Sequence, residues 1–83
     1  MYYCYILHSE KLDRYYVGST QDLTDRLARH NTGRSRSTKT GLPWRLVYQE
    51  SFASQSEAYQ RERKIKSWKS RRMIEQLLSE AEA

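Results

Sequence analysis

Glu62 is the residue of this sequence whose position most clearly suggests chemistry. At helical spacing Ala58, Glu62 and Ile65 share one face, which places the carboxylate in the middle of the face that should pack on a sheet. A carboxylate there needs an Arg, a metal ion or Tyr hydroxyls as a partner, because otherwise it takes up a proton. Two structural alternatives are a pair with Arg26 and a side chain that bends out to water among basic neighbours.

Two more candidates, Arg26 and His30, lie one helical turn apart. They flank an apolar stripe formed by Leu23 and Leu27. Arg26 can turn inward toward a site, or it can cover its apolar neighbours with its methylene groups while its charge stays in water. The stripe alone leaves both interpretations open.

Tyr5 and Tyr16 lie on two predicted strands of one hairpin. As cross-strand neighbours they would be an ordinary structural pair, and their hydroxyls could equally emerge at the sheet surface beneath the helices. The sequence contains seven Tyr, so position alone does not select these two.

Alternation and turn residues predict the elements that position these side chains. Residues 2–8 form a strand with Tyr3, Tyr5 and Leu7 on one face, the polar segment 9–13 breaks it, and residues 15–17 form its antiparallel partner, which stops at Gly18. Ser19 or Thr20 is expected to cap a helix that runs to about His30.

The second half of the chain predicts a loop, a strand and two helices. Residues 31–43 carry Gly, Pro, Ser and Thr without an apolar period, and a strand follows from Trp44 to Glu50 or Ser51. The Ser54-x-x-Glu57 capping box begins a helix that ends near residue 67, and residues 70–81 form the last helix. We therefore expect an α/β (α+β) fold with a small three-stranded antiparallel sheet flanked by about three helices, in the order β-β-α-β-α-α.

Length and composition place these elements in one unit. Eighty-three residues with 37% apolar composition and a mean hydropathy of −0.98 predict a single domain, residues 1–83, with a modest core. One Cys excludes an internal disulfide framework and a Cys-rich zinc site, and a free thiol fits a reducing interior. No apolar stretch approaches the roughly 20 residues of a membrane span, and no signal peptide is visible, so we expect a cytoplasmic protein that is not bound to a membrane.

Positive charge is concentrated in the middle of the chain. The net charge is +5, but residues 26–72 alone carry thirteen basic and three acidic side chains. Such a segment indicates either nucleic-acid binding or a solvated helix face with a basic loop. The candidates for binding phosphate are a loop group and a helical group: Arg34, Arg36 and Lys39, then Arg61, Arg63, Lys64, Lys66, Lys69, Arg71 and Arg72.

In their order and spacing, these residues resemble the GIY-YIG nuclease family. Tyr3-Cys4-Tyr5 stands where the first triad is expected and Tyr16-Val17-Gly18 stands for the second, and a helix with Arg26 and His30 follows. Glu62 lies in a segment, residues 61–66, that is similar to the region around the family's metal-binding glutamate. The match covers about residues 2–66 and is closest to short stand-alone bacterial proteins, similar to the N-terminal domain of the excision-repair incision subunit.

The resemblance implies metal-assisted hydrolysis of phosphodiester bonds in DNA, with RNA as an open alternative, in DNA repair or recombination. Glu62 and waters would bind Mg²⁺ or Mn²⁺, Arg26 would clamp the phosphate, and Tyr5 would hydrogen-bond the attacking water or the phosphate. Tyr16 or His30 would act as the base, and the resemblance favours Tyr16. If they act together, these side chains should converge on one partly open cleft.

Two other functions fit parts of the sequence. Several characterised members of the family use an Asn after the glutamate, and this chain has no Asn beyond Asn31. The alternative is therefore a catalytically inactive nucleic-acid-binding module of the same fold, and a third possibility is an adaptor that recruits an acidic partner protein. A protein partner that supplies targeting is compatible with the nuclease function, and the oligomeric state is left open.

Overall fold

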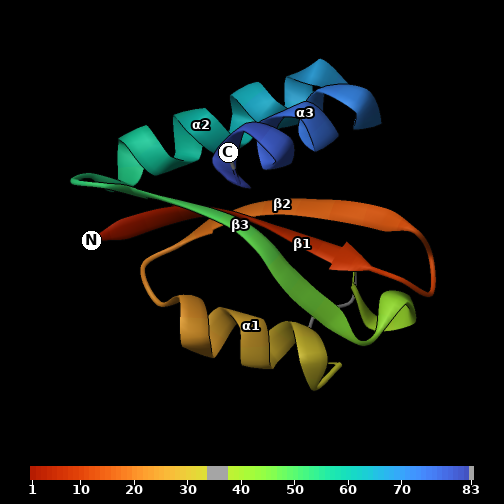
Figure 1. The fold of residues 1–83 in the computed structure, drawn as a ribbon. Helices are drawn as coiled ribbons and strands as arrows, with labels where there is room; N and C mark the ends of the chain where they lie inside the picture. The colour runs from red at the N-terminus through yellow and green to blue at the C-terminus, as the bar shows by residue number, and fades with distance from the viewer. Residues whose placement is uncertain (34–37, 83) are drawn as a thin grey trace.

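The computed structural model describes residues 1–33 and 38–82 and has the predicted α+β architecture (Figure 1). Two strands precede the first helix, and the third strand precedes the other two helices, so the order β-β-α-β-α-α is confirmed. The elements are β1 Tyr2–Ser9, β2 Arg14–Thr20, α1 Leu23–Asn31, the short 3₁₀ helix η1 Lys39–Gly41, β3 Trp44–Phe52, α2 Gln55–Trp68 and α3 Arg71–Glu82.

The three strands form one antiparallel sheet in the order β2-β1-β3, with β1 in the centre and β2 at one edge. In the β1–β2 hairpin Tyr5 pairs with Gly18 and Leu7 pairs with Tyr16. Helix α1 covers one face of this sheet and α2 with α3 covers the other (Figure 1). Side chains from the two faces can therefore meet only around an open edge.

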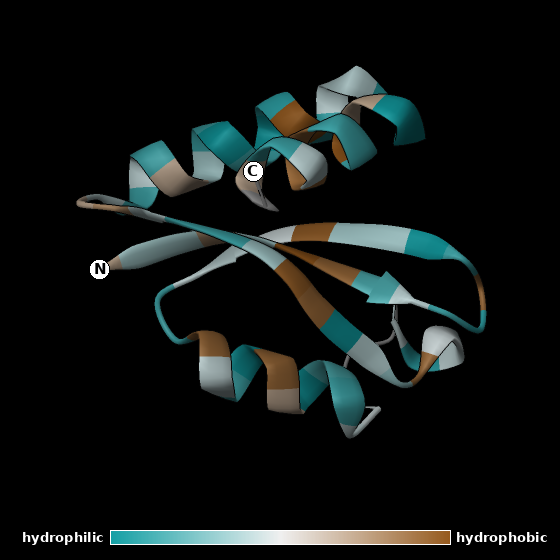
Figure 2. Cartoon of the chain, in the orientation of Figure 1, coloured by the Kyte–Doolittle hydropathy of each residue, from teal (hydrophilic) through white to brown (hydrophobic). Residues whose placement is uncertain are grey.

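Each face of the sheet has its own small core. On the α2 and α3 side the buried cluster consists of Cys4, Ile6, Val17 and Ile65, and on the α1 side it consists of Tyr5, Leu7 and Trp44. The predicted alternation along the first strand is confirmed, because successive side chains of a strand point to opposite faces. Figure 2 shows hydrophobic colour recurring along α1, while α2 is mostly hydrophilic in colour.

The helix starts confirm one capping prediction and correct another. Ser54 caps α2 as predicted, accepting a hydrogen bond from the Glu57 backbone N–H. Asp22, not Ser19 or Thr20, caps α1, with its side chain accepting from the Asp25 N–H. The prediction failed because β2 continues through Thr20, so Ser19 is a strand residue with its side chain committed to a face of the sheet.

Hydrogen bonds from side chains tie the connection between α1 and β3 to the sheet. The Asn31 side chain accepts from the Trp44 N–H at 2.6 Å and donates to the Trp44 carbonyl oxygen at 2.9 Å. Ser9 donates to the Gly41 carbonyl at 2.6 Å, and the Trp44 indole donates to the Thr38 carbonyl at 2.6 Å. These bonds place Thr38 against the C-terminal end of α1.

Candidate active site at the edge of the sheet

Tyr5 is a buried side chain whose ring lies directly over Gly18 on the neighbouring strand. It is 1% exposed, and a Cβ atom added at Gly18 would lie 2.5 Å from the Tyr5 hydroxyl oxygen. Only a residue without a side chain leaves room for the ring, which gives a physical reason for the Tyr-x-Gly pattern at residues 16–18. Gly18 thus positions the Tyr5 hydroxyl.

His30 is equally buried, at 1% exposure, and both of its ring nitrogens have partners. Nε2 lies 3.1 Å from the Tyr5 hydroxyl and Nδ1 lies 2.8 Å from Thr38 Oγ1. Burial lowers the pKa of His30, and the positive charge of Arg26 lowers it further. A neutral imidazole therefore links Tyr5 to Thr38 in one buried hydrogen-bonded chain.

The environment of Tyr5 keeps its hydroxyl protonated. Burial raises the pKa of Tyr5 most strongly, and Tyr16 and the Glu62 carboxylate also raise it, whereas the Arg26 guanidinium opposes them. Tyr5 is therefore a hydrogen-bond donor or acceptor rather than a base. Arg26 and Glu62 thus both act electrostatically on the same hydroxyl.

Tyr16 is half-buried and connects the aromatic cluster to the surface. Its ring centroid lies 6.5 Å from that of Tyr5 and 4.9 Å from that of His30, which meets it edge-on. The two tyrosines are diagonal neighbours rather than directly opposed, because Tyr5 pairs with Gly18. On the outer side, the Lys66 ammonium lies 5.8 Å from the centroid of the Tyr16 ring.

Arg26 projects from α1 and is half-buried at the same edge. It lines a cavity of about 350 Å³ together with Ser19 and Thr20 of β2. Its charge acts on both Tyr5 and His30, so it contributes to the electrostatics of the aromatic cluster. Asp22, Asp25 and Arg29 line the same cavity, and a guanidinium such as that of Arg26 can bind a phosphate through two parallel hydrogen bonds.

Glu62 lies on the inner face of α2, as its spacing with Ala58 and Ile65 predicts, and its side chain is 13% exposed. Ser19 donates a hydrogen bond to Oε1 at 2.6 Å, and the Lys66 ammonium lies 2.6 Å from Oε2. Among the described residues Glu62 pairs with Lys66, not with Arg26. One carboxylate oxygen is fixed by the sheet, and the other is held by a half-exposed lysine.

The candidate residues come from both faces of the sheet and meet around the β2 edge. Tyr5, Tyr16, Arg26 and His30 lie on the α1 side, and Glu62 reaches the edge from α2. Lys66 connects the two groups, because its ammonium contacts both Glu62 and the Tyr16 ring. Tyr16, Arg26 and Glu62 are half-buried, while Tyr5 and His30 lie behind them, out of contact with solvent.

The oxygen ligands that the protein offers at this edge suit a hard cation bound by few protein groups. In the part of the chain that the structure describes, no group of three or more His, Cys, Asp or Glu side chains could enclose a metal. Glu62 instead offers a single carboxylate. Mg²⁺ is commonly bound in this way, by one or two carboxylates, several waters and the phosphate of a substrate.

Several of the basic residues predicted to bind nucleic acid are paired with carboxylates. In the helical group, Arg61 pairs with Glu50, Lys66 with Glu62, and Arg71 with Asp13 and Glu75. Arg63 lies over the Tyr59 ring. The remaining members of this group and one loop residue are exposed: Lys64, Lys69, Arg72 and Lys39. Arg34 and Arg36 lie outside the described residues.

Three contributors to this site are absent from the predicted set of catalytic residues. Gly18 gives room to Tyr5, Ser19 orients Glu62, and Thr38 holds His30. For Ser19 the signal was present, since alternation along β2 places it on the same face as Val17, toward α2. Thr38 has no such signal, because its contact with His30 depends on how a long loop folds back.

The fold agrees with what comparisons with known proteins show. Residues 1–75 match the GIY-YIG catalytic domain. A UPF0213 protein of Streptococcus pneumoniae is 40% identical over 79 residues, covering 94% of this chain and 78% of its own length. A UPF0213 protein of Staphylococcus haemolyticus is 44% identical over 68 residues, covering 81% of this chain and 82% of its own.

A solved structure extends this likeness to three dimensions. The solution NMR structure of a UPF0213 protein from Bacillus halodurans is similar to this chain with a TM-score of 0.60 and 37% sequence identity, covering 95% of this chain and 84% of that one. The family match spans both tyrosines, Arg26, His30 and Glu62. The chain therefore belongs to the GIY-YIG family of nuclease domains.

Proposed function

We propose that this protein is a metal-dependent endonuclease that hydrolyses phosphodiester bonds in DNA. The observation that carries the proposal is the half-buried Glu62 carboxylate at the β2 edge, with Tyr16 and Arg26 on the other side of the same edge. Lys66 links Glu62 to Tyr16, and Arg26 and Glu62 both act on Tyr5. An acidic ligand, a phosphate-binding cation and a hydroxyl are the groups that such a reaction needs.

Glu62 would hold the metal ion. One Mg²⁺ or Mn²⁺ bound by Glu62 and waters would polarise a phosphoryl oxygen and stabilise the leaving oxygen. Ser19 keeps Oε1 in place, and Oε2 is held by Lys66, whose half-exposed side chain can move out into water. The carboxylate is thus both oriented and accessible.

Arg26 would bind the phosphate through its planar guanidinium and offset the charge that develops in the transition state. Its half-buried position beside a cavity would leave room for the phosphate. Tyr5 would keep Tyr16 and Arg26 at a fixed spacing, since it packs behind them with its hydroxyl bonded to His30.

Tyr16 is a better candidate for the base than His30. Both nitrogens of His30 are engaged and its ring is buried, so it cannot touch a water molecule bound at the surface. Tyr16 is half-buried and therefore within reach of a water bound at the surface. His30 would then position Tyr5 and accept no proton from the nucleophile.

The test is cleavage by the purified full chain with a matched pair of variants. Glu62→Gln keeps the size of the side chain and removes its charge, and Glu80→Gln makes the same change at an exposed position of α3. Branched, flapped, nicked and single-stranded DNA, with RNA strands in parallel, would be incubated with Mg²⁺, Mn²⁺ or EDTA. We expect Glu62→Gln to lower the cleavage rate by about 10²–10³-fold, as for removal of one electrostatic catalytic group.

In the same assay Glu80→Gln should cleave like the unmodified chain. Equal rates for the chain and for Glu62→Gln would overturn the proposal. The substrate preference in this assay also tests the finer parts of the proposal: DNA over RNA, and a role in DNA repair or recombination with a partner that supplies targeting.

We further propose that residues 1–83 act as a single domain in the cytoplasm, to which the buried free Cys4 is suited. Among the described residues no helix is long and apolar enough to cross a membrane.

A nucleic-acid-binding module without catalysis is the second candidate. Two observations favour it: Lys66 already neutralises Oε2 of Glu62, and the chain has no Asn after Asn31. This function predicts DNA binding that weakens with added salt, needs no metal and survives Glu62→Gln. Fluorescence anisotropy with labelled DNA at several salt concentrations measures all three.

A further inference from the structure

A second hollow lies beside the candidate active site, between the start of β2 and the junction of α2 with α3. Its volume is about 420 Å³, within the range of about 300–1,000 Å³ that is usual for small-ligand pockets. Tyr16 and Lys66 line it on the side of the active site. We call it the base groove, and its other lining residues used below are Arg14, Tyr15, Ile65, Lys69, Arg71 and Ile74.

The base groove combines an apolar floor with a cationic rim. Tyr15 and Ile74 supply apolar surface above the buried Ile65, and four cationic side chains line the groove, of which Lys66 and Arg71 are paired with carboxylates. Arg14 and Lys69 are exposed, and neither has an ion-pair partner among the described residues. A ligand that matches this lining has a flat apolar part joined to an anionic part.

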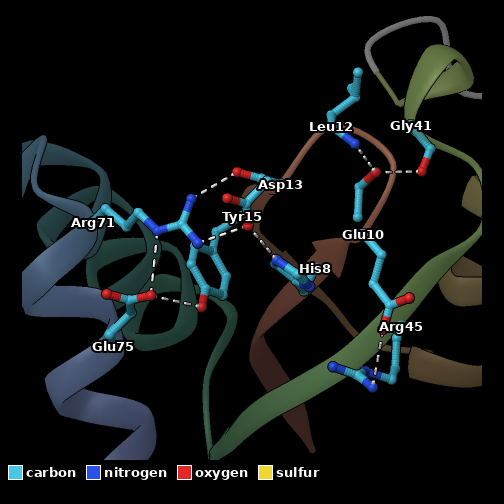
Figure 3. A network of polar contacts seen from close by, with 10 residues as sticks. His8, Glu10, Leu12, Asp13, Tyr15, Gly41, Arg45, Arg71 and Glu75 are labelled. Carbon is cyan, nitrogen blue, oxygen red and sulfur yellow. Dashed lines mark hydrogen bonds and ion pairs between the residues drawn. The ribbon is translucent and has the colours of Figure 1, made fainter.

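One wall of the base groove carries a network of polar contacts (Figure 3). Arg71 donates from Nη2 to Asp13 Oδ1 at 2.7 Å and from Nη1 to the Asp13 carbonyl at 2.8 Å. Its guanidinium also lies 5.4 Å from the centroid of the Tyr15 ring, and Glu75 holds its Nε at 3.2 Å. The turn before β2 and the start of α3 are thereby joined by ion pairs and a ring contact.

We propose that the base groove binds one unpaired nucleobase of the DNA strand, with the adjoining phosphates on Lys69 and Arg14. This inference rests on the proposed nuclease function and specifies its substrate. A phosphate bound near Arg26 and Glu62 would lie at the β2 edge, and Lys66, which lines the groove together with Tyr16, contacts Glu62 at that edge. A base that is paired in a duplex cannot enter such a hollow, so the strand must be single or locally unpaired there.

Binding of single strands to the full chain tests this directly. Fluorescein-labelled twelve-nucleotide strands would carry one abasic site, moved position by position, with EDTA present so that nothing is cleaved. We expect an abasic site at one position to weaken binding at least fivefold, and abasic sites elsewhere to change it less than twofold. Uniform effects at every position would overturn the proposal.

The isoleucine methyl groups report where the base binds. The chain has three isoleucines: Ile65 and Ile74 line the base groove, and Ile6 is fully buried in β1 and does not. In methyl NMR spectra the intact strand should shift the signals of Ile65 and Ile74 and leave the signal of Ile6 unchanged. The strand with the critical abasic site should not cause these shifts, and neither should a blunt duplex. Shifts that are the same with both strands would contradict the proposal.

Lys69 provides a variant that cannot fail merely by unfolding. It has a left-handed backbone, with φ at 47°, at the C-terminal end of α2, where Gly is normally preferred. Lys69→Gly should therefore raise the urea midpoint while weakening strand binding by threefold or more. Arg45→Ala removes an exposed charge on β3, at the other edge of the sheet from β2, and should change binding by less than twofold.

These readouts separate the base groove from the nuclease function. Metal-dependent cleavage without position-specific abasic effects would support the nuclease function and contradict the binding of a nucleobase in the base groove. Position-specific effects and isoleucine shifts without any cleavage would keep the groove and leave the protein as a binding module.

Discussion

The two faces of the sheet hold their polar side chains by different means. On the α1 side Tyr5, His30 and Thr38 are fully buried and joined by hydrogen bonds between uncharged groups. On the α2 side Glu62 is held by Ser19 and by Lys66, whose side chain is half exposed. A buried polar group left without a partner costs about 1–3 kcal/mol, whereas an exposed ion pair contributes less than about 1 kcal/mol. One side of the site is therefore fixed, and the other can exchange partners.

The largest effect on stability is expected from breaking the fixed side. His30→Ala leaves a cavity and deprives the Tyr5 hydroxyl and Thr38 Oγ1 of a buried partner, so unfolding should become easier by about 3 kcal/mol. Urea unfolding followed by circular dichroism measures this. His8→Ala, at a half-buried position whose imidazole bonds the exposed Asp13, is the control with a smaller expected loss. Equal losses of stability in the two variants would show that the buried hydrogen bonds of His30 contribute no more to stability than the partly exposed contact of His8.

A methyl group at Gly18 tests the same side without deleting any polar atom. In Gly18→Ala the new Cβ would lie 2.5 Å from the Tyr5 hydroxyl, so the ring must shift, and we expect a loss of about 1–3 kcal/mol. Gly33→Ala is a poor control because of its positive φ, whereas Ala53→Gly changes an exposed position outside the site. A Gly18→Ala protein with unchanged stability and an unmoved Tyr5 resonance would contradict the packing argument.

The pH dependence of stability should also report the fixed side. The pKa of His30 in the folded protein is lowered by burial and by Arg26, so the unfolded chain binds the proton more readily. This contribution to stability is complete above about pH 6.5, the ordinary His pKa, and is lost as the pH falls below it toward the lower pKa of the folded state. As the pH is lowered from 8 to 5, the urea midpoint should fall more steeply for the unmodified chain than for His30→Gln. The same dependence of the midpoint on pH in both proteins would show that His30 is not the group responsible.

The smallest effect is expected on the exchangeable side. Lys66→Met removes the ion pair with Glu62 and keeps the aliphatic part of the side chain, so stability should fall by less than about 0.5 kcal/mol. Lys64→Met is the matched change on the same helix. A loss above 1.5 kcal/mol for Lys66→Met alone would mean that Glu62 is held as firmly as His30 and would remove the contrast between the two faces.

The sequence predicted correctly the features that depend on local residue patterns. Alternation placed Tyr5 and Cys4 on opposite faces, helical spacing turned Glu62 inward, and the Ser54 capping box marked the start of α2. These features depend on neighbours within about four residues, which a single sequence displays directly.

Features set by distant contacts could not be predicted in this way. The diagonal arrangement of Tyr5 and Tyr16 follows from the hairpin register, in which Tyr5 meets Gly18. The bond between His30 and Thr38 depends on the path of the connection to β3, and the partner of Glu62 was decided by where β2 ends. Whether the predicted residues act in catalysis remains a proposal that the experiments above address.

The position of β2 at the edge of the sheet has a consequence for handling the protein. Among the described residues no strand pairs with the outer side of β2, and such an edge can pair with the same edge of another copy. Arg14 and Lys66 place positive charge beside it, and like charges discourage such pairing. Substitutions that neutralise them to weaken DNA binding would also remove protection against self-association. A loss of binding in such variants can be interpreted only after light scattering has shown that the protein is still monodisperse.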